Sequence, residues 1–169
     1  MRTSILAILL AAGLATAVRA GDIPNRLPEA KVGEWLLFQD VSGARAGEQT
    51  RFSVVDIQGE GDDKTLTMRM EKFGPDGTEE ESRDIEIKLD RFASRMAALE
   101  DKAKQISRER LTVKDKEFQV VAIAWDDDDP EREIRLWISP ELPIGGLVKS
   151  WSSDPEFPAA ELVDYGFQP

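Results

Sequence analysis

Hydrophobic and polar residues alternate along most of this chain, in short runs separated by glycine, proline and acidic residues. The clearest runs cover residues 65–73 and 83–89. Their inward positions are Leu66, Met68 and Met70 in the first run and Ile85, Ile87 and Leu89 in the second. A period of two residues is that of a β-strand with one buried face and one solvated face. Strands of this kind belong to antiparallel sheets.

Nine such runs predict nine strands. They cover residues 34–41, 50–57, 65–73, 83–89, 108–113, 118–125, 132–139, 147–151 and 159–167. The run 118–125 ("FQVVAIAW") is apolar on both faces, which is typical of a strand that is covered on both sides. The connections are short and no internal repeat is present. We therefore expect a mainly β (α+β) domain with one curved antiparallel sheet, shaped as a half-barrel or a sandwich.

One segment in the middle of the chain changes period. Its apolar residues are spaced by 4, 3, 4 and 3 positions and are Phe92, Met96, Leu99, Ala103 and Ile106. This spacing predicts an amphipathic helix inserted at about residues 90–106, with Asp90 capping its first turn. Such a helix covers the open side of a curved sheet or simply completes its core.

The N-terminal residues have the pattern of a cleaved signal peptide. Arg2 precedes an apolar run, 5–17. Val18 and Ala20 fit positions −3 and −1 of a cleavage site after Ala20, and "ATA" at 15–17 is the competing site. No cysteine follows, so an N-terminal lipid anchor on cysteine is excluded. We expect a signal peptide at 1–20, an extended lead-in at 21–32 and a single domain at 33–169. The mature chain is expected to be periplasmic or secreted and to have no transmembrane segment.

Composition narrows the chemistry that this chain can perform. The formal net charge is −11, so nucleic acids and anionic membrane surfaces would repel it. The absence of histidine and cysteine excludes a histidine base, a cysteine nucleophile and the usual zinc sites. We expect no cofactor and no enzymatic activity. A hydrolase that uses paired carboxylates is the remote alternative.

An acidic run at residues 126–129 raises the question of a calcium site. Successive residues in an extended chain point apart, so few of these carboxylates can converge on one ion. A solvated turn is the simpler interpretation, and a weak cation site at Asp126 and Asp128 is the alternative.

The main functional hypothesis is a binding domain for a lipid or another apolar small molecule, held on the concave face of the sheet. The expected ligand-binding residues are Met68, Met70, Ile85, Ile87, Phe92, Met96, Leu99, Trp125 and Trp137. The apolar helix face would cover this ligand. The alternative is a module that binds another envelope protein or has a structural role there.

The stretch "WISPELPIGGLVKSW" (137–151) predicts a stiff corner between two strands. Pro140 and Pro143 fix their φ angles, while Gly145 and Gly146 permit positive φ. A corner of this kind bends a sheet, and a binding lip is the second interpretation.

The same stretch resembles the signature of a group of uncharacterised secreted bacterial β-rich domains, W-x-S-x-x-(V/L)-P-x-G-G-L-V-K. Three further stretches carry the resemblance: "VGEWLLFQ" (32–39), "LTVKDKEFQVVAIAW" (111–125) and "AELVDYGF" (160–167). The resemblance implies secretion and a β-rich fold, but it does not indicate any particular activity. The expected architecture is also similar to the half-barrels of the LolA and LolB lipoprotein carriers, which implies a concave face that holds acyl chains under a helical lid.

Overall fold

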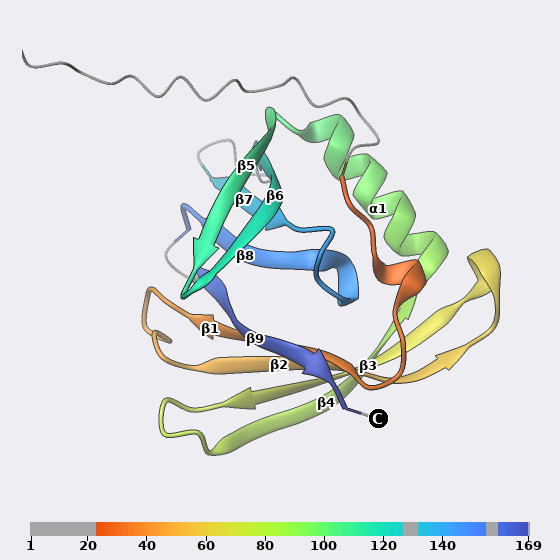
Figure 1. Ribbon diagram of the computed structural model, residues 1–169, viewed down its shortest axis with the longest axis horizontal. Helices are drawn as coiled ribbons and strands as arrows, with labels where there is room; N and C mark the ends of the chain where they lie inside the picture. The colour runs from red at the N-terminus through yellow and green to blue at the C-terminus, as the bar shows by residue number, and fades with distance from the viewer. Residues whose placement is uncertain (1–22, 127–131, 155–158, 169) are drawn as a thin grey trace, which may run out of the picture.

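The computed structural model describes residues 23–126, 132–154 and 159–168 (Figure 1). Nine strands form one sheet, in the order β4-β3-β2-β1-β9-β8-β7-β6-β5. Their bounds are β1 Glu34–Asp40, β2 Gln49–Gln58, β3 Thr65–Phe73, β4 Glu79–Lys88, β5 Gln105–Val113, β6 Lys116–Asp126, β7 Glu133–Ile138, β8 Leu147–Ser152 and β9 Ala160–Phe167. Each neighbouring pair is antiparallel, which confirms the predicted fold class.

The two edge strands, β4 and β5, are consecutive in the chain and are joined by helix α1 (Leu89–Lys102). A flat sheet of nine strands would separate its edges by about 38 Å, at about 4.8 Å per strand. The 14-residue helix spans only about 21 Å. The sheet must therefore curl until its edges face each other across the helix, and Figure 1 shows α1 beside this open side.

Register shifts support the curvature. They occur where β1 pairs with β9, β2 with β3, β3 with β4 and β7 with β8. A bulge adds local twist and bend to a strand. The result is one continuous, unclosed sheet, so the half-barrel expectation describes the fold better than a sandwich of two sheets.

Helix α1 is shorter than expected and starts earlier. It ends at Lys102, because Ala103 takes an extended conformation (φ −62°, ψ 123°) and Ile106 pairs with Ile123 as part of β5. Ile106 is an inward-facing position of β5, which begins three residues after the helix, and its distance from Ala103 happens to match the helical spacing. Asp90 is not the N-cap: Lys88 occupies that position without a side-chain cap, and Asp90 lies in the first helical turn.

Buried side chains form two clusters. The larger joins the inner faces of β1, β2, β3, β8 and β9 to the start of β6, and the smaller joins α1 to β6 and β7. Strand β6 contributes to both clusters, with Phe118 and Val120 in the first and Val121, Ile123 and Trp125 in the second. This explains why its sequence is apolar on both faces.

The lead-in is part of the core and not only an extended segment. Residues Leu27–Glu29 form a short 3-10 helix (η1), and Leu27 is only 2% exposed. In Figure 1 this segment runs alongside α1 before it enters β1. Arg26 Nη1 donates to the Pro140 carbonyl at 2.7 Å, and Lys64 Nζ donates to the Pro28 carbonyl at 2.7 Å. The expected signal peptide lies outside the described residues.

Candidate functional site

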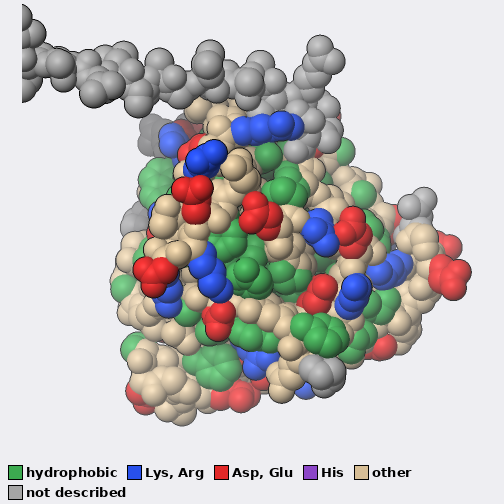
Figure 2. Space-filling model, viewed as in Figure 1, with side chains coloured by type: hydrophobic (Ala, Val, Ile, Leu, Met, Phe, Trp, Pro, Cys, Tyr) green, Lys and Arg blue, Asp and Glu red, His purple; other side chains and the backbone are tan. Residues whose placement is uncertain are grey.

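The inner face of the sheet is packed with the protein's own side chains. Leu66, Met68 and Met70 of β3 are all buried, and Met68 belongs to the larger core cluster. The 140–146 corner and η1 supply partners to that cluster through Leu142, Ile144 and Leu27. Figure 2 shows hydrophobic side chains gathered over β8 and this corner. Met68 and Met70, which were expected to touch a ligand, therefore lie in the core.

The corner inserts apolar side chains into the interior. Leu142 is fully buried and Ile144 is buried beside it. Ile144, Gly145 and Gly146 take φ of 48°, 75° and 78° in succession, and Ser139 N donates to the Gly146 carbonyl at 2.7 Å. The two glycines act as expected in a tight turn. Pro140 is exposed and Pro143 is half-buried, whereas Leu142 and Ile144 are buried. We therefore interpret this stretch as a corner that fills the core.

The two expected ligand-binding tryptophans, Trp125 and Trp137, face opposite sides of the sheet. Trp125 pairs with Ile134 and packs in the cluster under α1, where Met96 and Leu99 also pack. Trp137 pairs with Ala122 and faces away from α1. The structure therefore does not bring Trp125 and Trp137 together.

Three of the expected ligand-binding residues do share one surface feature. Ile85 and Ile87 of β4 and Phe92 of α1, all half-buried, line a groove of about 470 Å³ between the edge strand and the helix. We call it the β4–α1 groove. Its volume lies within the range of small-molecule sites, roughly 300–1,000 Å³.

The rim of the β4–α1 groove is basic. Lys88, Arg91 and Arg95 line it, together with the single acid Glu86. None of the three cations has an ion pair among the described residues. Sequence reasoning missed this rim, although a basic stripe at 88, 91 and 95 beside the apolar stripe was visible in the helical spacing.

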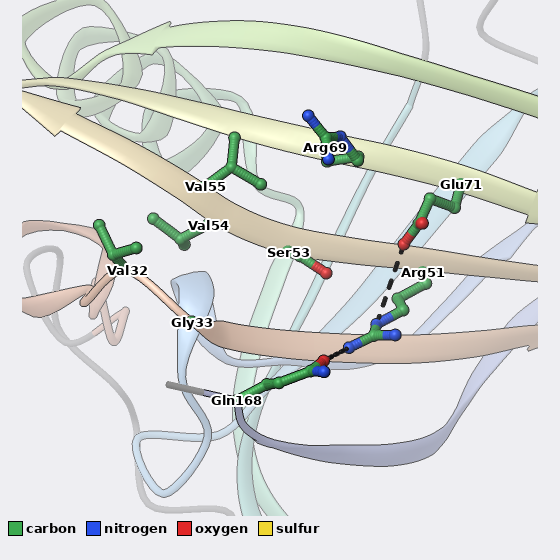
Figure 3. Close-up of a pocket in the computed structure, with 9 residues that line it drawn as sticks. All are labelled: Val32, Gly33, Arg51, Ser53, Val54, Val55, Arg69, Glu71 and Gln168. Carbon is green, nitrogen blue, oxygen red and sulfur yellow. Dashed lines mark hydrogen bonds and ion pairs between the residues drawn. The ribbon is translucent and has the colours of Figure 1, made fainter.

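A second groove, of about 510 Å³, crosses the outer face of β2 and β3 (Figure 3). Arg51 lines this groove: its Nη2 donates to Gln168 Oε1 at 2.9 Å, and its Nε is 4.0 Å from Glu71 Oε2. Its guanidinium also lies 4.8 Å from the Trp35 ring centroid. Figure 3 shows both polar partners turned toward Arg51. The guanidinium of Arg51 therefore already has partners within the protein, namely Gln168, Glu71 and Trp35.

The other cation of the second groove is also neutralised. Arg69 Nε donates to Asp84 Oδ1 at 2.9 Å, and this hydrogen bond lowers the pKa of Asp84 below its ordinary value. The two ion pairs leave the groove without an uncompensated charge. We interpret it as a structural feature of the outer face.

The described carboxylates offer little support for a metal site or for acid–base catalysis. Asp126 forms an ion pair with Lys104, Asp128 lies outside the described residues, and no cluster of three metal-ligating side chains occurs at 23–126, 132–154 or 159–168. Burial raises the pKa of Asp40, Arg45 opposes that rise, and Glu48 adds to it. Asp40 lines neither of the two grooves.

Comparisons with known proteins identify no relative, so this protein can be classified only by its fold. A scan against protein-family models, a search of curated proteins and a search of solved structures each found no match. In the described part of the chain, no helix is long and apolar enough to cross a bilayer. The class is that of a mainly β domain whose single open sheet is bridged at its edges by one helix.

Proposed function

We propose that this protein is an exported, non-enzymatic binding domain that holds an anionic amphiphile, such as a fatty acid, in the β4–α1 groove. The observation that carries the proposal is the combination of an apolar floor with a basic rim whose cations form no ion pair with any described residue. This relocates the expected apolar ligand from the filled inner face to the opening between an edge strand and the helix.

The apolar floor suits an acyl chain. Ile85, Ile87 and Phe92 are only half-buried, so each keeps apolar surface that a ligand can cover. Covering apolar surface contributes about 25 cal/mol per Å². Ile87 and Phe92 also pack against the larger core cluster, which fixes their positions from beneath.

The basic rim favours an anionic head group. Arg91 and Arg95 are four residues apart on one helix, a spacing at which like charges repel by a few tenths of a kcal/mol. The chain has 33 acidic residues against 22 basic ones, so three cations gathered on one groove stand out against this background. A bound carboxylate would relieve the repulsion and accept charge-assisted hydrogen bonds from both arginines.

Isothermal titration calorimetry with monomeric dodecanoate tests this proposal. We expect saturable binding that the double variant Arg91→Glu, Arg95→Glu weakens by roughly ten- to a hundredfold, because two favourable charge contacts become repulsive. The matched control is Arg45→Glu, Lys114→Glu, which changes the net charge equally at exposed turn positions that form no ion pair with another described residue. It should bind dodecanoate as the unmodified protein does.

Head-group selectivity supplies the second part of the test. Dodecyl maltoside has the same alkyl chain with a neutral head, and dodecyltrimethylammonium has a cationic head. We expect dodecanoate to bind more tightly than either. Equal binding of all three, or equal losses in the two double variants, would contradict the proposal.

The alternative, an interaction module that pairs through an edge strand, is disfavoured at β4. Its exposed residues include Glu79, Glu80, Arg83 and Asp84. Charged side chains along an edge strand oppose pairing with another chain. We therefore favour amphiphile binding over an interaction with another protein through β4.

A further inference from the structure

A second candidate binding surface lies on the face of β5, β6 and β7 that is turned away from α1. Its floor is Ala122 and Ala124 of β6, which leave a hollow of about 30 Å³. Across the ladder, Ala122 pairs with Ser107 and Trp137, and Ala124 pairs with Gln105 and Arg135. Because directly paired residues point to the same face of a sheet, these side chains surround the hollow. We call it the alanine slot.

One wall of the alanine slot is an aromatic ring. On the β8 side of Trp137, its cross-strand partner Lys149 places an ammonium 5.7 Å from the ring centroid. On its other side Trp137 pairs with Ala122, and Trp137 lines the slot. Trp151 lies on the same sheet face, diagonal to Trp137, and is 36% exposed. Two tryptophans thus extend the slot into a shallow aromatic surface.

The other wall is polar and belongs to β5. Gln105, Ser107 and Glu109 are spaced by two residues and line the slot. Ser107 Oγ donates to Glu109 Oε1 at 3.0 Å. Within the described residues, the Gln105 amide has no hydrogen-bond partner and the Glu109 carboxylate has no ion pair. Donor and acceptor groups therefore face an aromatic wall across a floor of small side chains.

We propose that the alanine slot binds a neutral oligosaccharide. A pyranose ring presents apolar C–H groups on one face, which suit the aromatic face of Trp137, and hydroxyls at its edges that both donate and accept hydrogen bonds. Gln105, Ser107 and Glu109 supply the matching groups. Arg135 is already neutralised by Glu133, so the slot has no free cation for a phosphate or carboxylate ligand. This site is independent of the β4–α1 groove.

The test is a tryptophan fluorescence titration of the full chain with four probes: cellohexaose, chitohexaose, xylohexaose and maltohexaose. We expect at least one of them to bind with a Kd of about 1 mM or tighter, with a change in emission that Trp137→Phe reduces. Phenylalanine keeps an aromatic ring in the partly buried position, so that variant should remain folded.

Matched variants identify the site. Gln105→Ala, Glu109→Ala should weaken the binding at least tenfold. Gln119→Ala, Glu117→Ala removes the same two groups from exposed positions on the other face of β6 and should leave binding unchanged. The proposal is overturned if none of the four probes gives a saturable signal, or if the two double variants lose affinity equally.

Discussion

Gly146→Ala is expected to lower the free energy of unfolding by about 3 kcal/mol or more, the larger of two stability effects that we predict. A Cβ atom at this position would lie 2.2 Å from the Ser139 carbonyl oxygen, which is backbone and cannot move aside cheaply. Gly146 also has a φ of 78°, which costs a residue with a side chain about 1–2 kcal/mol. The clash would displace the corner that connects β7 to β8, together with the buried side chain of Leu142.

The matched control for this substitution is Gly77→Ala. Gly77 has a φ of 81°, and a Cβ atom there would meet nothing within 4 Å. It therefore measures the cost of positive φ alone. Urea unfolding followed by tryptophan fluorescence gives both free energies. Equal losses in the two variants would show that the close approach at Ser139 does not matter.

Leu27→Ala is expected to lower the free energy of unfolding by about 2–4 kcal/mol. Leu27 is 2% exposed and packs in the larger cluster with the side chains of the corner, so its removal leaves a cavity. A lead-in that merely lay on the surface would tolerate the change.

Val32→Ala is the control in the same segment. Val32 is 49% exposed, and its truncation should change the free energy of unfolding by less than about 0.5 kcal/mol. Thermal and urea unfolding of both variants measure the difference. If Leu27→Ala is as mild as Val32→Ala, the lead-in does not belong to the core.

The strands could be predicted from sequence because one-sided burial leaves a period of two, as in Thr65–Phe73, whose predicted and observed bounds agree. The fourth strand starts at Glu79, four residues before the predicted start. Its first residues are charged and belong to an edge strand, so they lack the alternating apolar positions from which a strand is predicted. The end of α1 was misplaced because Ile106 continued the helical spacing from within β5.

The candidate sites depended on features that a linear pattern does not carry. Met68 is buried in the cluster that Leu27 of η1 and Leu142 and Ile144 of the corner complete, and these segments show no periodicity. The alanine slot depends on the register that pairs Ala122 with Ser107 and Trp137. Only the floor of the β4–α1 groove came directly from inward strand positions and the helical apolar stripe.

The most direct test of the central claim is a methyl and amide NMR titration of the protein with dodecanoate carrying a nitroxide spin label. If the amphiphile occupies the β4–α1 groove, relaxation enhancement will concentrate on Ile85, Ile87 and residues 91–95. The buried methyls of Leu66 and Leu142 will be less affected, and reduction of the label will restore the lost signals. Enhancement spread evenly over the surface, or none at saturating ligand, would contradict the account.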